Sequence, residues 1–416
     1  MKVCFLLHQG SMYSGGQGIY AHHLTRELVE LGHEVHVIAG PPYAELVDGV
    51  RVHKLRNYSI YRLLETGRFF FFGRHPVSFF HPINFYEIAT SRFGFFSVMA
   101  AFSFRAYLKL RELAETHHFD LVHDVQGLGY GTLLTRANGL PVVANIHHPL
   151  QVDRENSIRL ARTFNDKIRW ARFYPFFMQE LVARRMDRII TGSQASAASV
   201  MRLFRLPPEQ VAVIYDGVDT EAFRPLEVPK RPDSLLYVGN SDDRNKGARY
   251  LLEALALLKG RRHFRLTVVD RPNAFLVPML SHELGIEDRV TLTGRLSREE
   301  LVRLYNQATL VVSPSLYEGF GLPAAEAMAC GTPVLATTAG AFPEVIEDGV
   351  SGLLVPPGDA SALADAIERL MDDAELRQRL GQEARRRIVD HFSWRETALR
   401  TQALYQEVRS EAVRRC

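Results

Sequence analysis

Two glutamates provide carboxylates at a spacing that could hold an extended ligand in this chain of 416 residues. Glu318 and Glu326 lie in "SLYEGFGLPAAEAMACGTPVLA", and Glu318 follows an apolar run typical of a buried strand. Pro323 suits the first turn of a helix, so we expect a helix from about this residue through Ala329, with Gly331 ending it. Glu318 would then lie in the loop before the helix, and Glu326 would project from its first turn or the start of its second.

This arrangement suits an elongated anionic ligand, because two carboxylates so placed are too far apart to act as an acid–base pair on one bond. The backbone amides from Gly319 to Leu322 and the positive end of the helix dipole attract an anion. We expect sugar hydroxyls at Glu318, a diphosphate at the start of the helix and ribose hydroxyls at Glu326. The residues alone leave a plainer alternative open, in which Glu326 only compensates the helix dipole.

Short apolar runs alternate with segments of helical periodicity, which indicates parallel sheets with connecting helices. In the N-terminal half the predicted strands are "KVCFLL", "EVHVIAG", "FDLVHD", "PVVANIHH" and "RIITGS". A proline-containing, charged segment at 211–233 predicts a linker. The alternation then restarts with "SLLYVGN", "FRLTVVD", "RVTLTGR", "ATLVVSPS" and "TPVLATT". We therefore predict an α/β protein of two Rossmann-like, doubly wound parallel-sheet domains that face a central cleft, with the ligand in that cleft.

Composition and charge exclude several classes of function. The net charge is only +3, with a basic N-terminal half and an acidic C-terminal half, so no nucleic-acid partner is expected. The three cysteines, Cys4, Cys330 and Cys416, lie far apart, which argues against a disulfide framework and fits the reducing cytoplasm. The first residues lack the pattern of a secretory signal, and no stretch approaches the roughly 20 uncharged residues of a membrane span.

Residues 51–118 interrupt the alternation with a segment rich in phenylalanine and arginine. Of the chain's 25 phenylalanines, about half fall in the stretch 69–104, and basic residues outnumber acidic ones across the whole segment. Rows of phenylalanine with arginine at their edges predict shallow insertion into a membrane surface that carries anionic head groups. In the alternative interpretation these phenylalanines pack a helical insertion onto the core of the N-terminal domain.

The spacing of Glu318 and Glu326 resembles the E-x7-E pattern of retaining glycosyltransferases with the GT-B fold, in the version found in family 4. Similar motifs follow in the family's order: "GGQGIYAHHLTRELVELGHEVHVIAG", "VIYDGVDTEAFRP", "VGNSDDRNKG", "VTLTGRLSREELVRLYNQATLVVSPS", "EVIEDGVSGLLVPPGD" and "FSWRETALRTQALYQEV". The resemblance implies an acceptor-binding domain at 1–213 with an insertion at about 51–118. It also implies a nucleotide-sugar-binding domain at 214–390 and a C-terminal helix at 391–416 that packs back on the N-terminal domain.

The resemblance also assigns roles to single residues. Lys246 matches the lysine that contacts the donor diphosphate, and His147 matches the histidine beside the transferred sugar and the acceptor. Together with Glu318 they are the implied catalytic residues. The implied donor contacts are Gly16, Gly239, Asn240, Arg244, Lys246, Gly294, Arg295, Glu318, Gly319, Phe320, Gly321, Leu322 and Glu326. The implied acceptor contacts are Gly15, Gly16, His123, Asp124 and His147.

Asn240 departs from the family pattern, in which an arginine commonly occupies this position and pairs with the lysine on the diphosphate. We expect Arg244, four residues later in the same loop, to supply the second positive charge. No cofactor and no metal ion are expected, because protein cations and amides can neutralise the phosphates. The histidine doublets of the chain also lack the usual spacing of metal ligands.

The resemblance implies transfer of a sugar from a UDP- or GDP-linked donor to an acceptor with retention of anomeric configuration. The segment 51–118 favours a lipid-linked or membrane-surface glycan acceptor, and hence a cytoplasmic protein peripheral to the inner face of the membrane that acts in cell-envelope glycan biosynthesis. A small soluble acceptor is the alternative. Two rivals share the fold: a sugar-nucleotide epimerase, and a catalytically weak protein that only binds sugar nucleotides.

Overall fold

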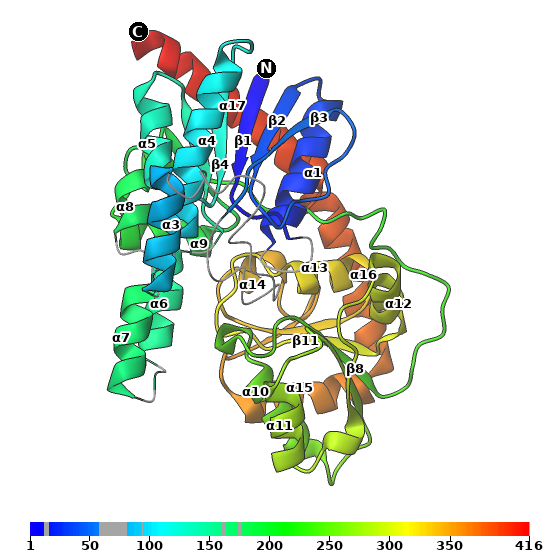
Figure 1. Cartoon of the computed structure of the whole chain (residues 1–416). Coiled ribbons are helices and arrows are strands. Elements are labelled where there is room, and N and C mark those ends of the chain that lie inside the picture. The colour runs from blue at the N-terminus through cyan, green and yellow to red at the C-terminus, as the bar shows by residue number, and fades with distance from the viewer. Residues whose placement is uncertain are drawn as a thin grey trace. The chain divides into compact units, whose positions relative to one another are not determined.

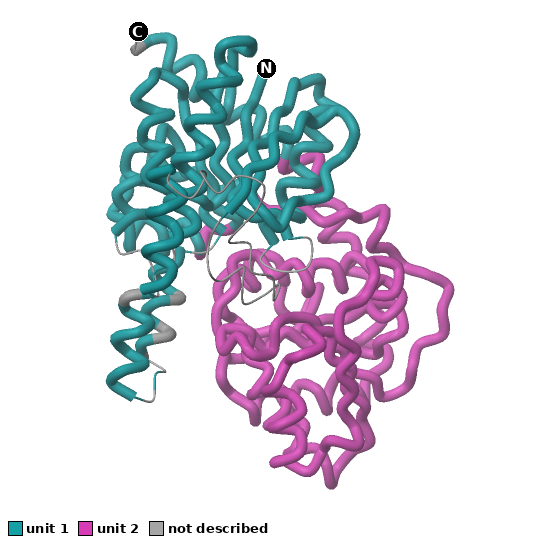
Figure 2. The backbone as a smooth tube through the Cα atoms, in the orientation of Figure 1, with its two compact units in different colours: residues 1–192, 196–214, 398–416 teal, residues 193–195, 215–397 magenta. Residues whose placement is uncertain are grey.

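The computed structural model describes residues 1–11, 16–57, 81–93, 95, 97–147, 149–159, 161, 163–173 and 177–415. Figure 1 shows their strands gathered into sheets with helices packed around them. The chain divides into two compact units, which Figure 2 colours separately. The first unit comprises residues 1–192, 196–214 and 398–416, and the second comprises residues 193–195 and 215–397.

The first unit is built on a parallel sheet. Within the described residues this sheet has seven strands, in the order β3 (Val50–Lys54), β2 (Glu34–Ala39), β1 (Lys2–Leu7), β4 (Leu121–Val125), β5 (Val142–Asn145), β6 (Arg188–Thr191) and β7 (Val211–Val213). The strand order changes direction at β1, which pairs with β2 on one side and β4 on the other. This is the switch point at which ligands of open α/β sheets bind, outside the carboxyl ends of the strands.

Helices connect these strands and cover the sheet. In the described part of this unit they are α1 (Gln17–Glu30), α3 (Pro82–Arg92), α4 (Val98–Ala114), α5 (Tyr130–Ala137), α6 (Leu150–Arg159), α7 (Phe164–Phe173), α8 (Met178–Ala183), α9 (Gln194–Phe204) and the short 3-10 helix η2 (Pro208–Gln210). The strands β1, β4 and β5 are almost wholly buried, because parallel strands under helices present apolar side chains to both faces.

The second unit repeats this plan. Its described sheet has six parallel strands, in the order β10 (Val290–Leu292), β9 (Arg265–Val269), β8 (Ser234–Val238), β11 (Leu310–Ser313), β12 (Val334–Thr337) and β13 (Leu353–Val355). Here the order changes direction at β8, between β9 and β11. Two separate clusters of buried apolar residues fill this unit, in accord with a sheet that is covered on both faces.

The helices of the second unit are η3 (Arg244–Lys246), α10 (Ala248–Leu258), α11 (Leu276–Glu283), η4 (Glu287–Arg289), α12 (Arg298–Gln307), α13 (Leu322–Ala329), α14 (Phe342–Val345), α15 (Ala360–Asp372) and α16 (Ala374–His391). Side chains fix several of their starts. Ser297 and Glu300 form a capping box on α12, and Asp359 accepts a hydrogen bond of 2.9 Å from the backbone amide of Ala362 on α15. Such caps satisfy amides that have no partner inside the helix.

The final helix α17 (Trp394–Arg415) begins in the second unit, and its residues from Ala398 onward belong to the first. Tyr405 of this helix is fully buried in the first unit. Arg188 at the start of β6 forms ion pairs of 2.7 Å with Glu407 and 2.6 Å with Glu411. This part of α17 is therefore held to the first unit by burial and by charge.

The prediction of two doubly wound α/β units is confirmed. The expectation that residues 51–118 form an insertion is wrong for the described residues at the two ends of this range, which belong to the sheet and the core of the first unit. Most of β3 falls inside this range, and β3 pairs with β2 along its whole length. The helix α4 packs into the core of the first unit through Phe102, Ala106 and Leu110. Sequence analysis missed β3 and α4, because the many phenylalanines of this range are typical of an apolar segment outside the fold. Residues 58–80 lie outside the described residues.

The side chains of this region divide into buried and exposed groups. Phe102 is buried, whereas Phe85 on α3 and Phe93 just after it have exposed fractions of 56% and 66%. Each helix in the described part of the chain is too short or too polar to span a bilayer. The alternative of packing onto the core thus holds for α4, and the exposed aromatic side chains belong to α3 and the residues that follow it.

Replacing Gly131 by alanine tests the contact between α5 and α4. A side chain at this position would collide with the backbone of Ser103, so we expect Gly131→Ala to lower the free energy of unfolding by about 1–3 kcal/mol. Gly260→Ala is the control, because its side chain would meet no atom within 4 Å. Thermal and chemical denaturation measure both. Equal stability of the two variants would contradict the close contact between α5 and α4.

Candidate active site

The loop after β8 carries the candidate lysine of the second unit. Asp243 accepts a hydrogen bond of 2.9 Å from the backbone amide of Asn245 and so caps the short helix η3, which ends at Lys246. Gly247 follows with a φ of 66°, a conformation that glycine adopts readily. Any side chain here would collide with the carbonyl oxygen of Pro314 after β11. The loops after the neighbouring strands β8 and β11 therefore meet backbone to backbone.

Lys246 and Glu318 form an ion pair across these two loops. The Nζ atom of Lys246 lies 3.0 Å from Oε1 and 2.9 Å from Oε2 of Glu318. The hydroxyl of Ser315 donates a hydrogen bond of 3.2 Å to the same carboxylate. Gly340 approaches the backbone of Glu318 so closely that no side chain fits at that position. The lysine keeps about a third of its side chain exposed, so its ammonium group remains accessible to a ligand.

The helix α13 begins directly after this pair. Gly321, with a φ of 93°, precedes its first residue Leu322, and no side chain caps this end of the helix. Phe320 is buried, which anchors the turn beneath the helix start. A helix end without a side-chain cap presents backbone amides and the positive end of the dipole to an anion. The structure thus brings Lys246, Glu318 and the start of α13 together, as the sequence predicts.

Glu326 lies further along α13 and turns towards α12. The hydroxyl of Tyr305 donates a hydrogen bond of 2.9 Å to Oε2 of Glu326. Desolvation raises the pKa of the Glu326 carboxyl to about 7, although the hydrogen bond from Tyr305 acts in the opposite direction. Sequence analysis missed Tyr305, because a buried tyrosine on an amphipathic helix looks like an ordinary core residue. The predicted contact of Glu326 with ribose stays a prediction.

Asn240 has a positively charged neighbour that the sequence did not suggest. Arg271, after β9, donates hydrogen bonds of 3.1 Å to Oδ1 of Asn240 and 2.8 Å to Oδ2 of Asp242. Arg244, to which we assign the second positive charge, is exposed on η3. Both arginines follow strands that end at the same edge of the sheet.

The other predicted donor contacts of the second unit lie in three loops, which follow β8, β10 and β11. Gly239 directly follows β8 and has a φ of 154°, a backbone conformation that residues with side chains rarely adopt. Gly294 follows β10, is buried and has a φ of 76°, while Arg295 beside it is exposed. Gly319 lies in the turn between Glu318 and the start of α13. The roles of these four residues stay predictions.

In the first unit, Gly16 and His147 lie at the carboxyl edge of the sheet. Gly16, with a φ of 69°, is the N-cap of α1 and leaves that helix end without a side-chain cap. The backbone amide of His147 donates a hydrogen bond of 3.2 Å to the side chain of Gln126. The His147 ring packs edge-on against Tyr20 of α1 at a centroid distance of 4.7 Å. Gly15 lies outside the described residues, so its predicted role stays a prediction.

A buried hydrogen-bond network lies next to His147 and includes Tyr20, which its ring contacts. The Tyr20 hydroxyl donates a hydrogen bond of 3.0 Å to Oδ1 of Asn145, which also accepts one from Nε2 of His123. On its other side, Nδ1 of His123 accepts a hydrogen bond from the hydroxyl of Tyr405 on α17. Burial lowers the pKa of His123 to about 3, so its ring is neutral and its tautomer follows from these two bonds.

His123 and Asp124 are therefore not placed as acceptor contacts, which corrects the expectation from sequence. His123 is fully buried and Asp124 is 1% exposed. The Asp124 carboxylate accepts hydrogen bonds from the backbone amides of Gly127 and Leu128 and from the hydroxyl of Thr132, so it shapes the loop that leads into α5. Both residues are buried and hold neighbouring side chains and loops in place. The sequence could not distinguish this role from a ligand contact at the end of a strand.

Comparison with known proteins places this chain in a family. Residues 14–222 match Glycosyltransferase Family 4, and residues 218–387 match Glycosyl transferases group 1. The chain is 39% identical over 414 residues to the MMP alpha-(1->4)-mannosyltransferase of Mycolicibacterium hassiacum, covering 98% of each chain. It is 30% identical over 433 residues to a D-inositol 3-phosphate glycosyltransferase of Frankia alni, covering 97% of each.

Solved structures agree on the fold. A sucrose-phosphate synthase from Thermosynechococcus elongatus aligns with a TM-score of 0.76 at 24% identity, covering 99% of this chain and 100% of the other. Anabaena HepE in complex with UDP-glucose aligns with a TM-score of 0.71 at 19% identity, covering 98% and 100%. The chain therefore belongs to glycosyltransferase family 4, and it is a glycosyltransferase with the GT-B fold.

The raised pKa of Glu326 predicts a pH-dependent stability. Between about pH 4.5 and 7 the folded protein holds a proton on Glu326 that the unfolded chain releases, so the stability that this group contributes falls as the pH rises. Glu326→Gln removes this loss. We therefore expect the variant to gain stability relative to the wild type as the pH rises through that range, in denaturation curves without ligand. Glu221→Gln, at an exposed carboxyl, is the control; a difference for Glu326→Gln that does not vary with pH would contradict the shift.

Proposed function

We propose that this glycosyltransferase moves a mannosyl residue from a nucleoside diphosphate, UDP or GDP, to a hydroxyl group of a glycan acceptor with retention of configuration. The observation that carries the proposal is the pairing of Lys246 with Glu318 beside the uncapped start of α13. The choice of mannose and of an α product is supported by the relative that is 39% identical, whose name gives an alpha-(1->4)-mannosyltransferase.

The donor would bind with its diphosphate at Lys246 and the start of α13. As the glycosidic bond breaks, negative charge increases on the phosphate oxygen that leaves the sugar. A fixed ammonium group and aligned amides stabilise this charge in the transition state. Lys246 is held by Glu318 before the donor arrives, which reduces the reorganisation needed on binding. Glu318 would keep its hydrogen bond from Ser315 and would also accept hydrogen bonds from sugar hydroxyls.

The described site residues bear on the route by which configuration would be retained. A double displacement needs two carboxyl groups of the protein about 5 Å apart at the same glycosidic bond, one as the nucleophile and one as the general acid. In the second unit the Glu318 carboxylate is engaged by Lys246 and Ser315, and Glu326 by Tyr305. We therefore infer a front-face route, in which the departing phosphate takes the proton of the acceptor hydroxyl. His147 would orient the acceptor through its imidazole ring.

For the acceptor we propose a glycan at a membrane surface. The exposed aromatic side chains Phe85, Tyr86 and Phe93 on and after α3, together with Arg92, offer apolar area beside a positive charge. The D-inositol 3-phosphate glycosyltransferases among the relatives favour a small soluble acceptor as the second candidate. The two candidates differ in whether a vesicle surface raises the rate.

The donor site predicts which substitutions weaken nucleotide binding. Removing a charge-assisted hydrogen bond is worth about 1.5–3 kcal/mol, so Lys246→Met should raise the Kd for a nucleoside diphosphate about ten-fold or more in calorimetry. Arg244→Met should act in the same direction if Arg244 supplies the second positive charge. Arg249→Met is the control, because Arg249 is exposed on α10 and pairs with Glu253. An effect of Arg271→Met without one of Arg244→Met would move the second charge to Arg271.

A direct assay tests the reaction. We expect GDP- or UDP-mannose and an oligomannoside to yield free nucleoside diphosphate and a product whose new linkage is α by NMR. Lys246→Met should reduce kcat/KM at least about ten-fold. The same oligomannoside linked to lipid in anionic vesicles should react faster than the free one. A β linkage would refute retention, an absence of released nucleoside diphosphate would refute transfer, and equal rates on both acceptors would refute the membrane-surface acceptor.

A further inference from the structure

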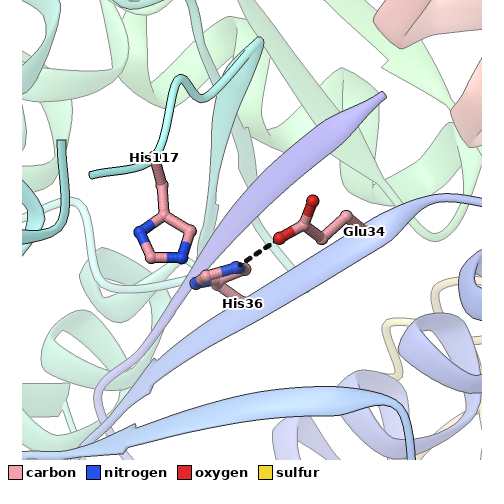
Figure 3. Close-up of side chains that lie close together, drawn as sticks. All are labelled: Glu34, His36 and His117. Carbon is pink, nitrogen blue, oxygen red and sulfur yellow. Dashed lines mark hydrogen bonds and ion pairs between the residues drawn. The ribbon is translucent and has the colours of Figure 1, made fainter.

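Three side chains of the first unit gather at the edge of the sheet opposite to the one that carries Gly16 and His147. Glu34 and His36 lie at the start of β2, and His117 follows the end of α4 (Figure 3). One ligand atom from each, a carboxylate oxygen or a ring nitrogen, lies within 4.8 Å of the other two. Two imidazoles and one carboxylate are a set of ligands that Zn²⁺ binds in proteins.

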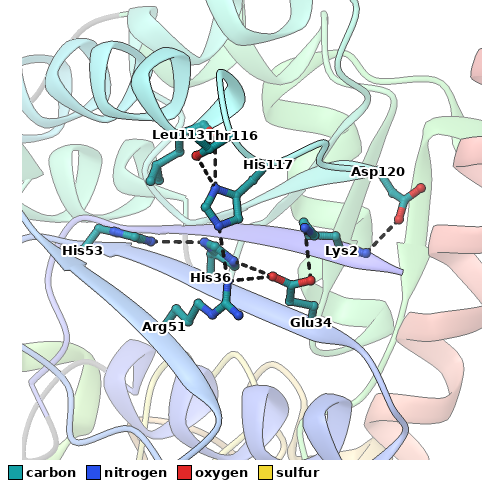
Figure 4. A network of polar contacts seen from close by, with 9 residues as sticks. All are labelled: Lys2, Glu34, His36, Arg51, His53, Leu113, Thr116, His117 and Asp120. Carbon is teal, nitrogen blue, oxygen red and sulfur yellow. Dashed lines mark hydrogen bonds and ion pairs between the residues drawn. The ribbon is translucent and has the colours of Figure 1, made fainter.

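Neighbouring groups orient the ligand atoms of Glu34 and His117. Lys2 holds Oε2 of Glu34 at 3.1 Å, which leaves Oε1 turned towards Nε2 of His36, also at 3.1 Å (Figure 4). The ring nitrogen Nδ1 of His117 lies 2.7 Å from the hydroxyl oxygen of Thr116 and 3.3 Å from the carbonyl oxygen of Leu113. Donation from Nδ1–H to this carbonyl leaves a lone pair on Nε2, which faces the cluster. Such secondary contacts orient histidine ligands and strengthen metal binding.

His36 receives similar support from the neighbouring strand. Its Nδ1 atom lies 3.1 Å from Nε2 of His53 on β3. When Nδ1–H of His36 donates to His53, Nε2 of His36 carries a lone pair directed at Glu34. His36 is fully buried and its ring packs edge-on against His117 at a centroid distance of 4.8 Å. Burial on this strand holds the ring in place before any ion arrives.

A positively charged group already lies between two of these atoms. The Nη1 atom of Arg51 is 3.0 Å from Oε1 of Glu34 and 3.2 Å from Nε2 of His117. The cluster therefore offers acceptor atoms to a cation at this point. The side chain of Arg51 is 58% exposed, so its guanidinium can move into water when a stronger ligand for these atoms binds.

We propose that Glu34, His36 and His117 bind one Zn²⁺ ion through Oε1, Nε2 and Nε2, with Arg51 displaced and water as the fourth ligand. Two imidazole nitrogens select Zn²⁺ and similar transition metals over Mg²⁺ and Ca²⁺, which prefer oxygen. The ion ties the start of β2 to the segment that leads from α4 into β4. It stabilises the first unit at the edge remote from Gly16 and His147, so this proposal is independent of the proposed transfer reaction.

Calorimetric titration of the full-length protein with Zn²⁺, after treatment with a chelator, tests the site. We expect one Zn²⁺ per chain and a higher melting temperature when Zn²⁺ is present, because an ion that binds only the folded state stabilises it. Glu34→Gln and His117→Gln should each weaken binding by about ten-fold or more. Co²⁺ in place of Zn²⁺ should give the absorption of a four-coordinate site in the wild type and lose it in both variants.

Two further variants separate this site from adventitious binding. His118→Gln removes an exposed histidine next to His117 and should leave Zn²⁺ affinity unchanged. Arg51→Gln removes the competing cation and should bind Zn²⁺ several-fold more tightly. Wild type that binds no more Zn²⁺ than His117→Gln, or weaker binding by Arg51→Gln, would overturn the proposal. Circular dichroism of the metal-free variants checks folding. Glu34→Gln changes a partly exposed side chain and supplies the comparison if His117→Gln does not fold.

Discussion

The ion pair of Lys246 with Glu318 depends on close contact between the loops that follow two neighbouring strands. Gly247 allows this contact, and Gly340 lets the loop after β12 lie against Glu318, because a side chain at either glycine would collide with the backbone of the loop beside it. A hydrogen bond of 2.7 Å from the amide of Leu316 to the carbonyl of Asn245 closes the same junction. The strands β8 and β11 thus determine where one ammonium group and one helix start lie together, and the proposed donor chemistry follows from that constraint.

The first unit supports its candidate residue in a comparable way. His147 lies on a loop after β5, and the side chains that hold its surroundings come from α1, β5, β4 and α17. His123 at the centre of this network is buried and neutral, so its hydrogen bonds have a fixed direction. Networks of this kind keep a loop residue oriented while the residue itself remains available to a ligand.

Much of this could be predicted because its signals are local in sequence. Apolar runs reveal β1 and β11, and the proline and glycines around Glu318 reveal the start of α13. The remaining features depend on contacts between distant residues. His123 meets Tyr405, which is 282 positions away, and His36 meets His117 across the sheet, so neither pattern appears in a short window. The segment 51–118 misled for a related reason, since composition cannot tell which phenylalanines a neighbouring helix covers.

A crystal structure of the full chain with bound UDP or GDP tests the central claim most directly. The β-phosphate should lie within hydrogen-bonding distance of Nζ of Lys246, about 2.7–2.9 Å for a charge-assisted bond, and beside the amides at the start of α13. A nucleotide bound elsewhere on the protein, with the pair of Lys246 and Glu318 undisturbed, would contradict the account.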